Sequence, residues 1–107
     1  MAFSMKQNDT SPAIAAYLLD QDENPIDLTA CTVRFIMRKR GETNYKVYQT
    51  VTIVDEDTGR IRYNWDAADT DEAGTFDAEF EVTYSDGTIE TFPNDTYVTV
   101  NILDDLG

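Results

Sequence analysis

The sequence predicts an all-β protein that folds as a single antiparallel β-sandwich of about seven to eight strands. Short segments alternate apolar and polar residues with a period of two, as strands with one buried face do. Turn residues interrupt the chain about every 8–12 residues, and no segment has the 3.6-residue period of a long amphipathic helix. The chain has 107 residues, of which 41% are apolar, which is enough for one core and one domain.

The N-terminal quarter should supply an entry segment and the first long strand. Residues 1–12 are polar, so we expect a loose arm or a short edge strand before a domain that spans residues 13–107. Residues 13–19 form an apolar run of strand length, which stops at the turn cluster 20–25. Residues 26–29 are expected to form one helical turn.

Three further segments with a period of two follow in the middle of the chain. Residues 32–39 place Val33, Phe35 and Met37 on one face and Arg34, Ile36 and Arg38 on the other. Residues 44–54 alternate again, with Tyr45, Val47, Val51 and Ile53 in the inward register. After the turn 55–59, residues 60–65 direct Ile61, Tyr63 and Trp65 to the core.

The C-terminal third contains the clearest strand. Past the acidic, turn-like residues 66–74, one face carries Phe76, Ala78, Phe80, Val82 and Tyr84, and the other carries Asp77, Glu79, Glu81 and Thr83. The turn 85–87 predicts a hairpin with residues 88–92, Pro93 breaks the ladder, and residues 96–103 form the last strand. The core should combine members of all these strands: Val33, Phe35, Trp65, Phe76, Phe80, Val82, Val98 and Val100.

One local pattern makes the sandwich immunoglobulin-like. Glu72-x-Gly74-x-Phe76-x-Ala78 resembles the Asp-x-Ala/Gly-x-Tyr-x-Cys pattern where strands E and F of immunoglobulin domains meet. Phe76 has no hydroxyl, so it cannot form the tyrosine corner of those domains, and Ala78 replaces the disulfide cysteine.

Composition excludes several function classes. The chain has 8 basic and 21 acidic residues, a net charge of −13 and no histidine. The whole imbalance lies in residues 51–107, and a chain this acidic repels nucleic acid and anionic membranes. Without histidine there is no Ser-His-Asp triad, and the lone Cys31 cannot form an internal disulfide. No apolar run approaches the ~18 residues of a membrane span, and no signal-peptide pattern heads the sequence.

Two motifs invite catalytic or metal-binding interpretations that we reject. Asp57-Thr58-Gly59 matches the tripeptide of aspartic proteases, but Asp55 and Glu56 precede it where an apolar strand is needed, so we interpret it as a turn. Asp20-x-Asp22-x-Asn24 has the ligand spacing of calcium loops, but Pro25 and Cys31 stand where an EF-hand needs Gly and Glu. We therefore predict a protein that is not an enzyme and has no catalytic residue, metal site or cofactor.

Surface aromatic residues are the remaining candidates for a site. Tyr17, Tyr45, Tyr63 and Trp65 are assigned to the core, whereas Tyr48 and Tyr97 fall in the outward register. Tyr48, Tyr97 and Arg40 form the candidate interaction surface. An alternative function is a carbohydrate-binding module, with Tyr48 or Tyr97 stacking on a sugar and an acidic loop holding calcium.

The resemblance to a known family rests on the segment Tyr63-Asn64-Trp65, Asp69-Thr70-Asp71 and Gly74 to Val82, followed by Asp86-Gly87 and Glu90 to Asn94. This run, together with the turn 22–29, resembles the N-terminal domain of baseplate upper proteins of tailed bacteriophages over residues 13–103. The resemblance implies a non-enzymatic structural or adaptor module of the virion, assembled in the bacterial cytoplasm into tail, baseplate or fibre. It implies other virion proteins as partners, with self-association or multi-copy assembly, and neither nucleic acid nor membrane. The chain ends at Gly107 without the receptor-binding region of those proteins, so a tail, neck or capsid protein and an excised domain all stay open.

The charged faces of two strands also predict their register. If residues 32–39 and 76–84 are the adjacent antiparallel strands C and F, matching their core and polar faces gives paired residue numbers that sum to about 115, within about two residues. This places Arg38 beside Asp77, Arg34 beside Glu81 and Phe35 beside Phe80. The basic cluster 34–40 would then be partly neutralised by its own sheet.

Overall fold

The computed structural model describes residues 2–106 and contains nine strands in two sheets within that range, more than the seven to eight expected. One short 3-10 helix, Ala67–Thr70, lies between the sixth and seventh strands. The strands are β1 (Ala2–Lys6), β2 (Ile14–Tyr17), β3 (Thr32–Lys39), β4 (Val47–Thr50), β5 (Thr52–Asp55), β6 (Arg60–Tyr63), β7 (Gly74–Thr83), β8 (Ile89–Phe92) and β9 (Val98–Leu103).

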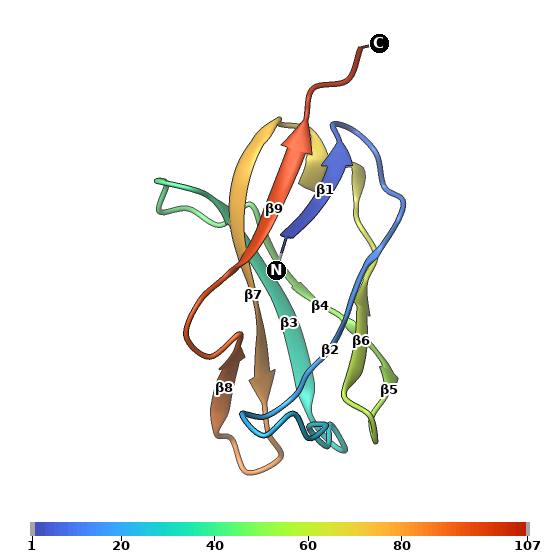
Figure 1. Ribbon diagram of the computed structural model, residues 1–107, viewed down its shortest axis with the longest axis vertical. Helices are drawn as coiled ribbons and strands as arrows, with labels where there is room; N and C mark the ends of the chain where they lie inside the picture. Colours follow the sequence, from blue (N-terminus) through green and yellow to red (C-terminus); the bar gives the residue numbers. More distant parts are fainter. Residues whose placement is uncertain (1, 107) are drawn as a thin grey trace.

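The strands form a large and a small sheet that pack face to face (Figure 1). The large sheet has the order β1-β9-β7-β3-β4, with β8 also paired to β7. The small sheet has the order β2-β6-β5. All pairs are antiparallel except β1 with β9, which is parallel. The polar N-terminal residues thus supply an edge strand of the large sheet.

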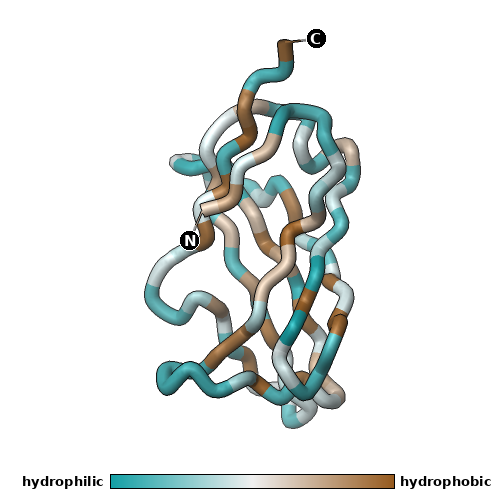
Figure 2. Tube along the Cα trace, turned by 45° about the vertical axis from the view of Figure 1, so that its right-hand side comes forward, coloured by the Kyte–Doolittle hydropathy of each residue, from teal (hydrophilic) through white to brown (hydrophobic). Residues whose placement is uncertain are grey.

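The core forms where the inward faces of the two sheets meet. Along β7 the exposure alternates residue by residue, so that Phe76, Phe80 and Val82 are at most 1% exposed. Figure 2 shows hydrophobic and hydrophilic residues alternating along the strands, with hydrophilic residues at many of the turns. The eight core residues predicted from parity are all buried, and Trp65, with 4% exposure, is the most accessible of them. Phe35 packs on Tyr63, Trp65 and Phe80 with ring centroids 4.8–5.5 Å apart, at the centre of this core.

The register of β3 on β7 is the predicted one. It runs from Thr32 opposite Thr83 to Lys39 opposite Phe76. Arg38 therefore lies opposite Asp77, Arg34 opposite Glu81, and Phe35 opposite Phe80. A slip of one residue would turn these charged side chains toward the core, so the alternation of both strands excludes it.

Two local expectations are wrong. Residues 44–54 do not form one strand: β4 pairs with β3 in the large sheet, whereas β5 pairs with β6 in the small one. The chain crosses between the sheets at Val51, which is buried and separates the two strands. Residues 26–29 form no helical turn, because Leu18 and Glu56 take the backbone donors of Ile26 and Leu28.

A buried tyrosine fixes the corner between β6 and β7. The hydroxyl of Tyr63 donates to Asp69 Oδ2 over 2.5 Å, and the backbone N–H of Asp66 donates to the same oxygen over 2.9 Å. Burial, with the hydrogen bond to Asp69, raises the pKa of Tyr63 above its usual value. Phe76 has no hydroxyl, so Tyr63 on the preceding strand supplies the side-chain hydroxyl that secures this connection.

Candidate interaction surface

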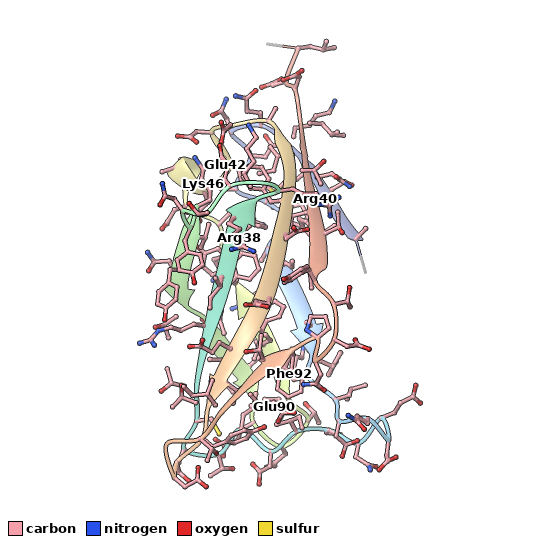
Figure 3. The ribbon with its side chains drawn as sticks, turned by 90° about the vertical axis from the view of Figure 1, so that its left-hand side faces the viewer. Arg38, Arg40, Glu42, Lys46, Glu90 and Phe92 are labelled. Carbon is pink, nitrogen blue, oxygen red and sulfur yellow. The ribbon has the colours of Figure 1, made fainter. Side chains whose placement is uncertain are left out.

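The three candidate residues lie on or beside the outward side of the large sheet, which we call the outer face. We define it by the outward-pointing residues of β3 and β7 and by the tyrosines that flank them: Arg34, Ile36, Arg38, Tyr45, Tyr48, Asp77, Glu79, Glu81 and Tyr97. Figure 3 views this side, with Arg38 on β3 and Arg40 just past the end of that strand. Ile36 is 6% exposed although it points away from the core, because the long side chains around it cover it.

Arg40 is tied to its own sheet. Its Nε and Nη2 donate to Asp77 Oδ1 over 3.1 and 2.7 Å, and Nη2 also reaches Thr99 Oγ1 at 3.4 Å. The hydrogen bond to Asp77 raises the pKa of Arg40 above its usual value. The guanidinium thus links β3, β7 and β9, which occupies much of its hydrogen-bonding capacity.

Tyr48 belongs to an exposed aromatic pair. Its side chain is 46% exposed and its ring centroid lies 5.5 Å from that of Tyr45, which is 59% exposed. The guanidinium carbon of Arg34 lies 5.6 Å from the Tyr48 centroid, which is cation–π distance. The two rings and the arginine therefore support one another at the β4 edge of the outer face.

Tyr97 stands on the opposite side of the same face. It is 46% exposed and lines a shallow cavity of about 80 Å³ together with Ile36, Arg38, Tyr45, Asp77 and Glu79. A second hollow of about 330 Å³ lies on its other side, lined by Glu79, Thr91 and residues 93–97. Tyr45 and Tyr97 therefore face a common depression whose floor is charged.

Ion pairs neutralise part of the basic cluster 34–40, but not through the partners expected from the register. Among the ion pairs of the described residues, none joins Arg38 to Asp77 or Arg34 to Glu81. Besides Arg40 with Asp77, Lys39 Nζ lies 3.2 Å from Glu72 Oε2. Lys46, just before β4, pairs with Asp71. Within residues 2–106, Arg38 takes part in none of these ion pairs and lies between Asp77 and the tyrosine rings.

Sequence reasoning missed two surface tyrosines. Tyr45 was assigned to the core, but it precedes β4 in a loop, where strand parity does not apply. Tyr17 was also assigned inward, yet it is 58% exposed and has Arg60 over its ring at 5.7 Å. For Tyr45, the sequence does contain a signal: Gly41 and the polar residues 42–44 indicate a loop that runs up to this tyrosine.

The two rejected motifs lie in exposed turns. Asp57 is exposed between β5 and β6, and its N–H donates to Asp55 Oδ1 over 3.1 Å, as the turn interpretation predicted. Asp20 Oδ1 accepts the backbone N–H groups of Asp22 and Asn24, both over 2.9 Å. In the part of the chain that the structure describes, no three or more acidic or cysteine side chains are grouped to hold a metal ion. The same part holds no helix with the length and hydropathy needed to cross a membrane.

Comparison with known proteins identifies the family. The model of the BppU N-terminal domain, the N-terminal domain of the baseplate upper protein, matches residues 3–104, which is nearly the whole chain. A search of curated proteins found no match. None of these findings supports the alternative of a carbohydrate-binding module. The chain therefore belongs to the BppU N-terminal domain family, which implies a virion-associated structural protein of the phage baseplate.

Proposed function

We propose that this chain is a non-enzymatic adaptor module of the baseplate, assembled in the host cytoplasm and acting through contacts with other virion proteins. The observation that carries the proposal is the exposure of three tyrosines on one side of the large sheet: Tyr48 on β4, and Tyr45 and Tyr97 in the loops that precede β4 and β9. Tyrosine is enriched at protein interfaces because its ring buries a large area at low entropic cost, and its hydroxyl can form a hydrogen bond when the ring is buried.

The order of the strands supports an immunoglobulin-like sandwich as the scaffold. The sequence β9-β7-β3-β4 in one sheet and β2-β6-β5 in the other corresponds to strands G-F-C-C′ and B-E-D of variable-type immunoglobulin domains. On this correspondence the outer face is the G-F-C-C′ face, built on the most extensively paired strands of the molecule.

The size of the central depression favours a protein partner over a small ligand. Its volume of about 80 Å³ is well below the ~300–1,000 Å³ typical of small-molecule pockets. The adjoining hollow of about 330 Å³ is large enough, but most of its lining is polar, whereas such pockets are mostly apolar. The charged floor of Arg38, Asp77 and Glu79 would then set orientation, while the flanking rings supply most of the binding energy.

Particle incorporation tests the proposal. Phage particles carrying the wild-type chain, a Tyr48→Ala/Tyr97→Ala chain or a Tyr48→Phe/Tyr97→Phe chain are purified, and the chain is quantified by mass spectrometry against a tail protein. We expect the wild type and the phenylalanine control to be incorporated alike and the alanine variant to be depleted. Absence of the wild-type chain from purified particles would overturn the proposed function.

A further inference from the structure

A different part of the molecule, the side beside β2, combines an apolar cavity with an unpaired strand edge. The cavity has a volume of about 240 Å³ and lies where the small sheet ends. Four consecutive lining residues lie on and just after β2: Ala16, Tyr17, Leu18 and Leu19. The other four lie in the large sheet or directly after β8: Phe80, Phe92, Pro93 and Val98. Figure 3 labels Phe92 on β8, the large-sheet strand that borders this side.

The backbone of β2 offers hydrogen bonds on this side. The N–H of Leu18 donates to the carbonyl of Gly59 over 2.9 Å, so residue 18 points toward β6. Because the polar groups of alternate residues in an antiparallel ladder point the same way, those of Ala15 and Tyr17 point away from β6. Within residues 2–106 no strand pairs with this second edge of β2.

The edge of β2 lacks the features that keep other edges from pairing. Residues 13–19 contain no charge, whereas β1 contains Lys6, β8 contains Glu90, and β5 has Asp55 and an irregular register. The remaining edge, β4, is uncharged from Val47 to Thr50 but directly follows Lys46. Natural proteins protect edge strands with charges, bulges or proline, and an unprotected apolar edge is a template for another strand. Tyr17 and Leu19, 58% and 40% exposed, add apolar surface there.

We propose that this side binds an extended strand of another virion protein, which joins the small sheet next to β2 and places an apolar side chain in the cavity. A strand is the occupant that satisfies alternating N–H and C=O groups, and the cavity lies where its inward side chain would project. This proposal rests on the proposed function and names the partner's chemistry.

Charge determines which strand fits. A second copy of this chain would also carry a net charge of −13, and the turn after Leu19 already exposes Asp22 and Glu23. A different chain, with alternating apolar residues and basic flanks, therefore complements this side better than β2 of a second copy does.

The test uses a short synthetic peptide of alternating valine and threonine with lysines at both ends. Ala15→Pro removes a backbone donor that points away from β6, so the β2–β6 ladder survives, and Ala15→Val is the matched control that keeps the donor. We expect the peptide to slow hydrogen exchange at the Ala15 and Tyr17 amides, and to bind the proline variant about tenfold or more weakly than the valine variant. If the proline variant unfolds, N-methylation of alternate peptide amides gives the same test from the peptide's side.

Each outcome decides the matter. Failure of the peptide to protect these amides, or equal binding by the proline and valine variants, would overturn the proposal. Concentration-dependent dimerisation that Ala15→Pro abolishes would instead assign the edge to a second copy and also overturn it. These results are independent of particle incorporation, so the proposed function can stand when strand addition fails.

Discussion

The outer face and the side beside β2 differ in which polar groups they expose and in whether those groups are paired. Beside the outer face, Arg40 donates to Asp77 and Thr99, so one acidic side chain of that face is paired within the sheet. Beside β2 there is no charge along residues 13–19, and the unpaired groups are backbone N–H and C=O. The two proposals above assign these regions two modes of contact: aromatic side chains on the outer face, and strand pairing at β2. A module with two such surfaces can connect two neighbours.

The largest expected effect comes from the core that underlies both regions. Phe80 is 1% exposed, and its ring centroid lies 5.3 Å from that of Phe35. The same side chain lines the cavity beside β2. Phe80→Ala should cost about 3–5 kcal/mol of unfolding free energy, because it removes the ring and leaves a cavity. Urea denaturation measures this, and a loss below about 1 kcal/mol would mean that the β7 side chains do not form the shared core.

Replacing Gly59 with alanine tests how closely the turn before β6 packs against the end of β2, and the same change at Gly87, in an open turn, is the control. Gly59 and Gly87 both have positive φ, +69° and +88°. A Cβ on Gly59 would lie 2.6 Å from the carbonyl oxygen of Leu18, whereas one on Gly87 meets nothing within 4 Å. Gly59→Ala should therefore cost about 1–3 kcal/mol more than Gly87→Ala in thermal or urea melts. Equal costs would show that β2 is not held as closely to this turn.

The sequence predicted the strands and the β3–β7 register because both faces of those strands carry unambiguous residues. Several registers keep the charged side chains outside, but only the observed one places both arginines opposite acids, Arg34 opposite Glu81 and Arg38 opposite Asp77. The crossing at Val51 could not be predicted, since a strand that changes sheet keeps its period of two. Tyr17 was assigned wrongly because residues 13–19 are apolar throughout, so no period of two in the sequence shows that Ile14 and Leu18 point inward and Tyr17 outward.

Tyr63→Phe tests the corner at the other end of β6, the strand beside β2. The change removes the hydroxyl that satisfies buried Asp69 and should cost about 1–2 kcal/mol. The pKa of Tyr63 is raised in the folded state, so its contribution is full below the ordinary tyrosine pKa of about 10 and is lost as the pH rises beyond it. Wild-type stability should fall more steeply than that of Tyr63→Phe above about pH 10, and parallel profiles would contradict this.

The smallest effect should come from the ion pairs of the outer face. Asp77→Asn weakens the contact with Arg40 and should cost about 0.2–1 kcal/mol, less at high salt. Glu81→Gln, beside Arg34 in the same register, is the control without an ion pair in the described residues and should change stability less. A larger loss for Glu81→Gln would contradict the assignment of Arg40 as the residue that links the sheet.

The most direct test of a module with two contact surfaces is a cryo-electron microscopy reconstruction of the assembled baseplate with this chain in place. We expect density for a strand of a neighbouring protein alongside residues 14–17, and a second neighbour against Tyr48 and Tyr97. A reconstruction in which the edge of β2 and both tyrosines face open solvent would contradict it.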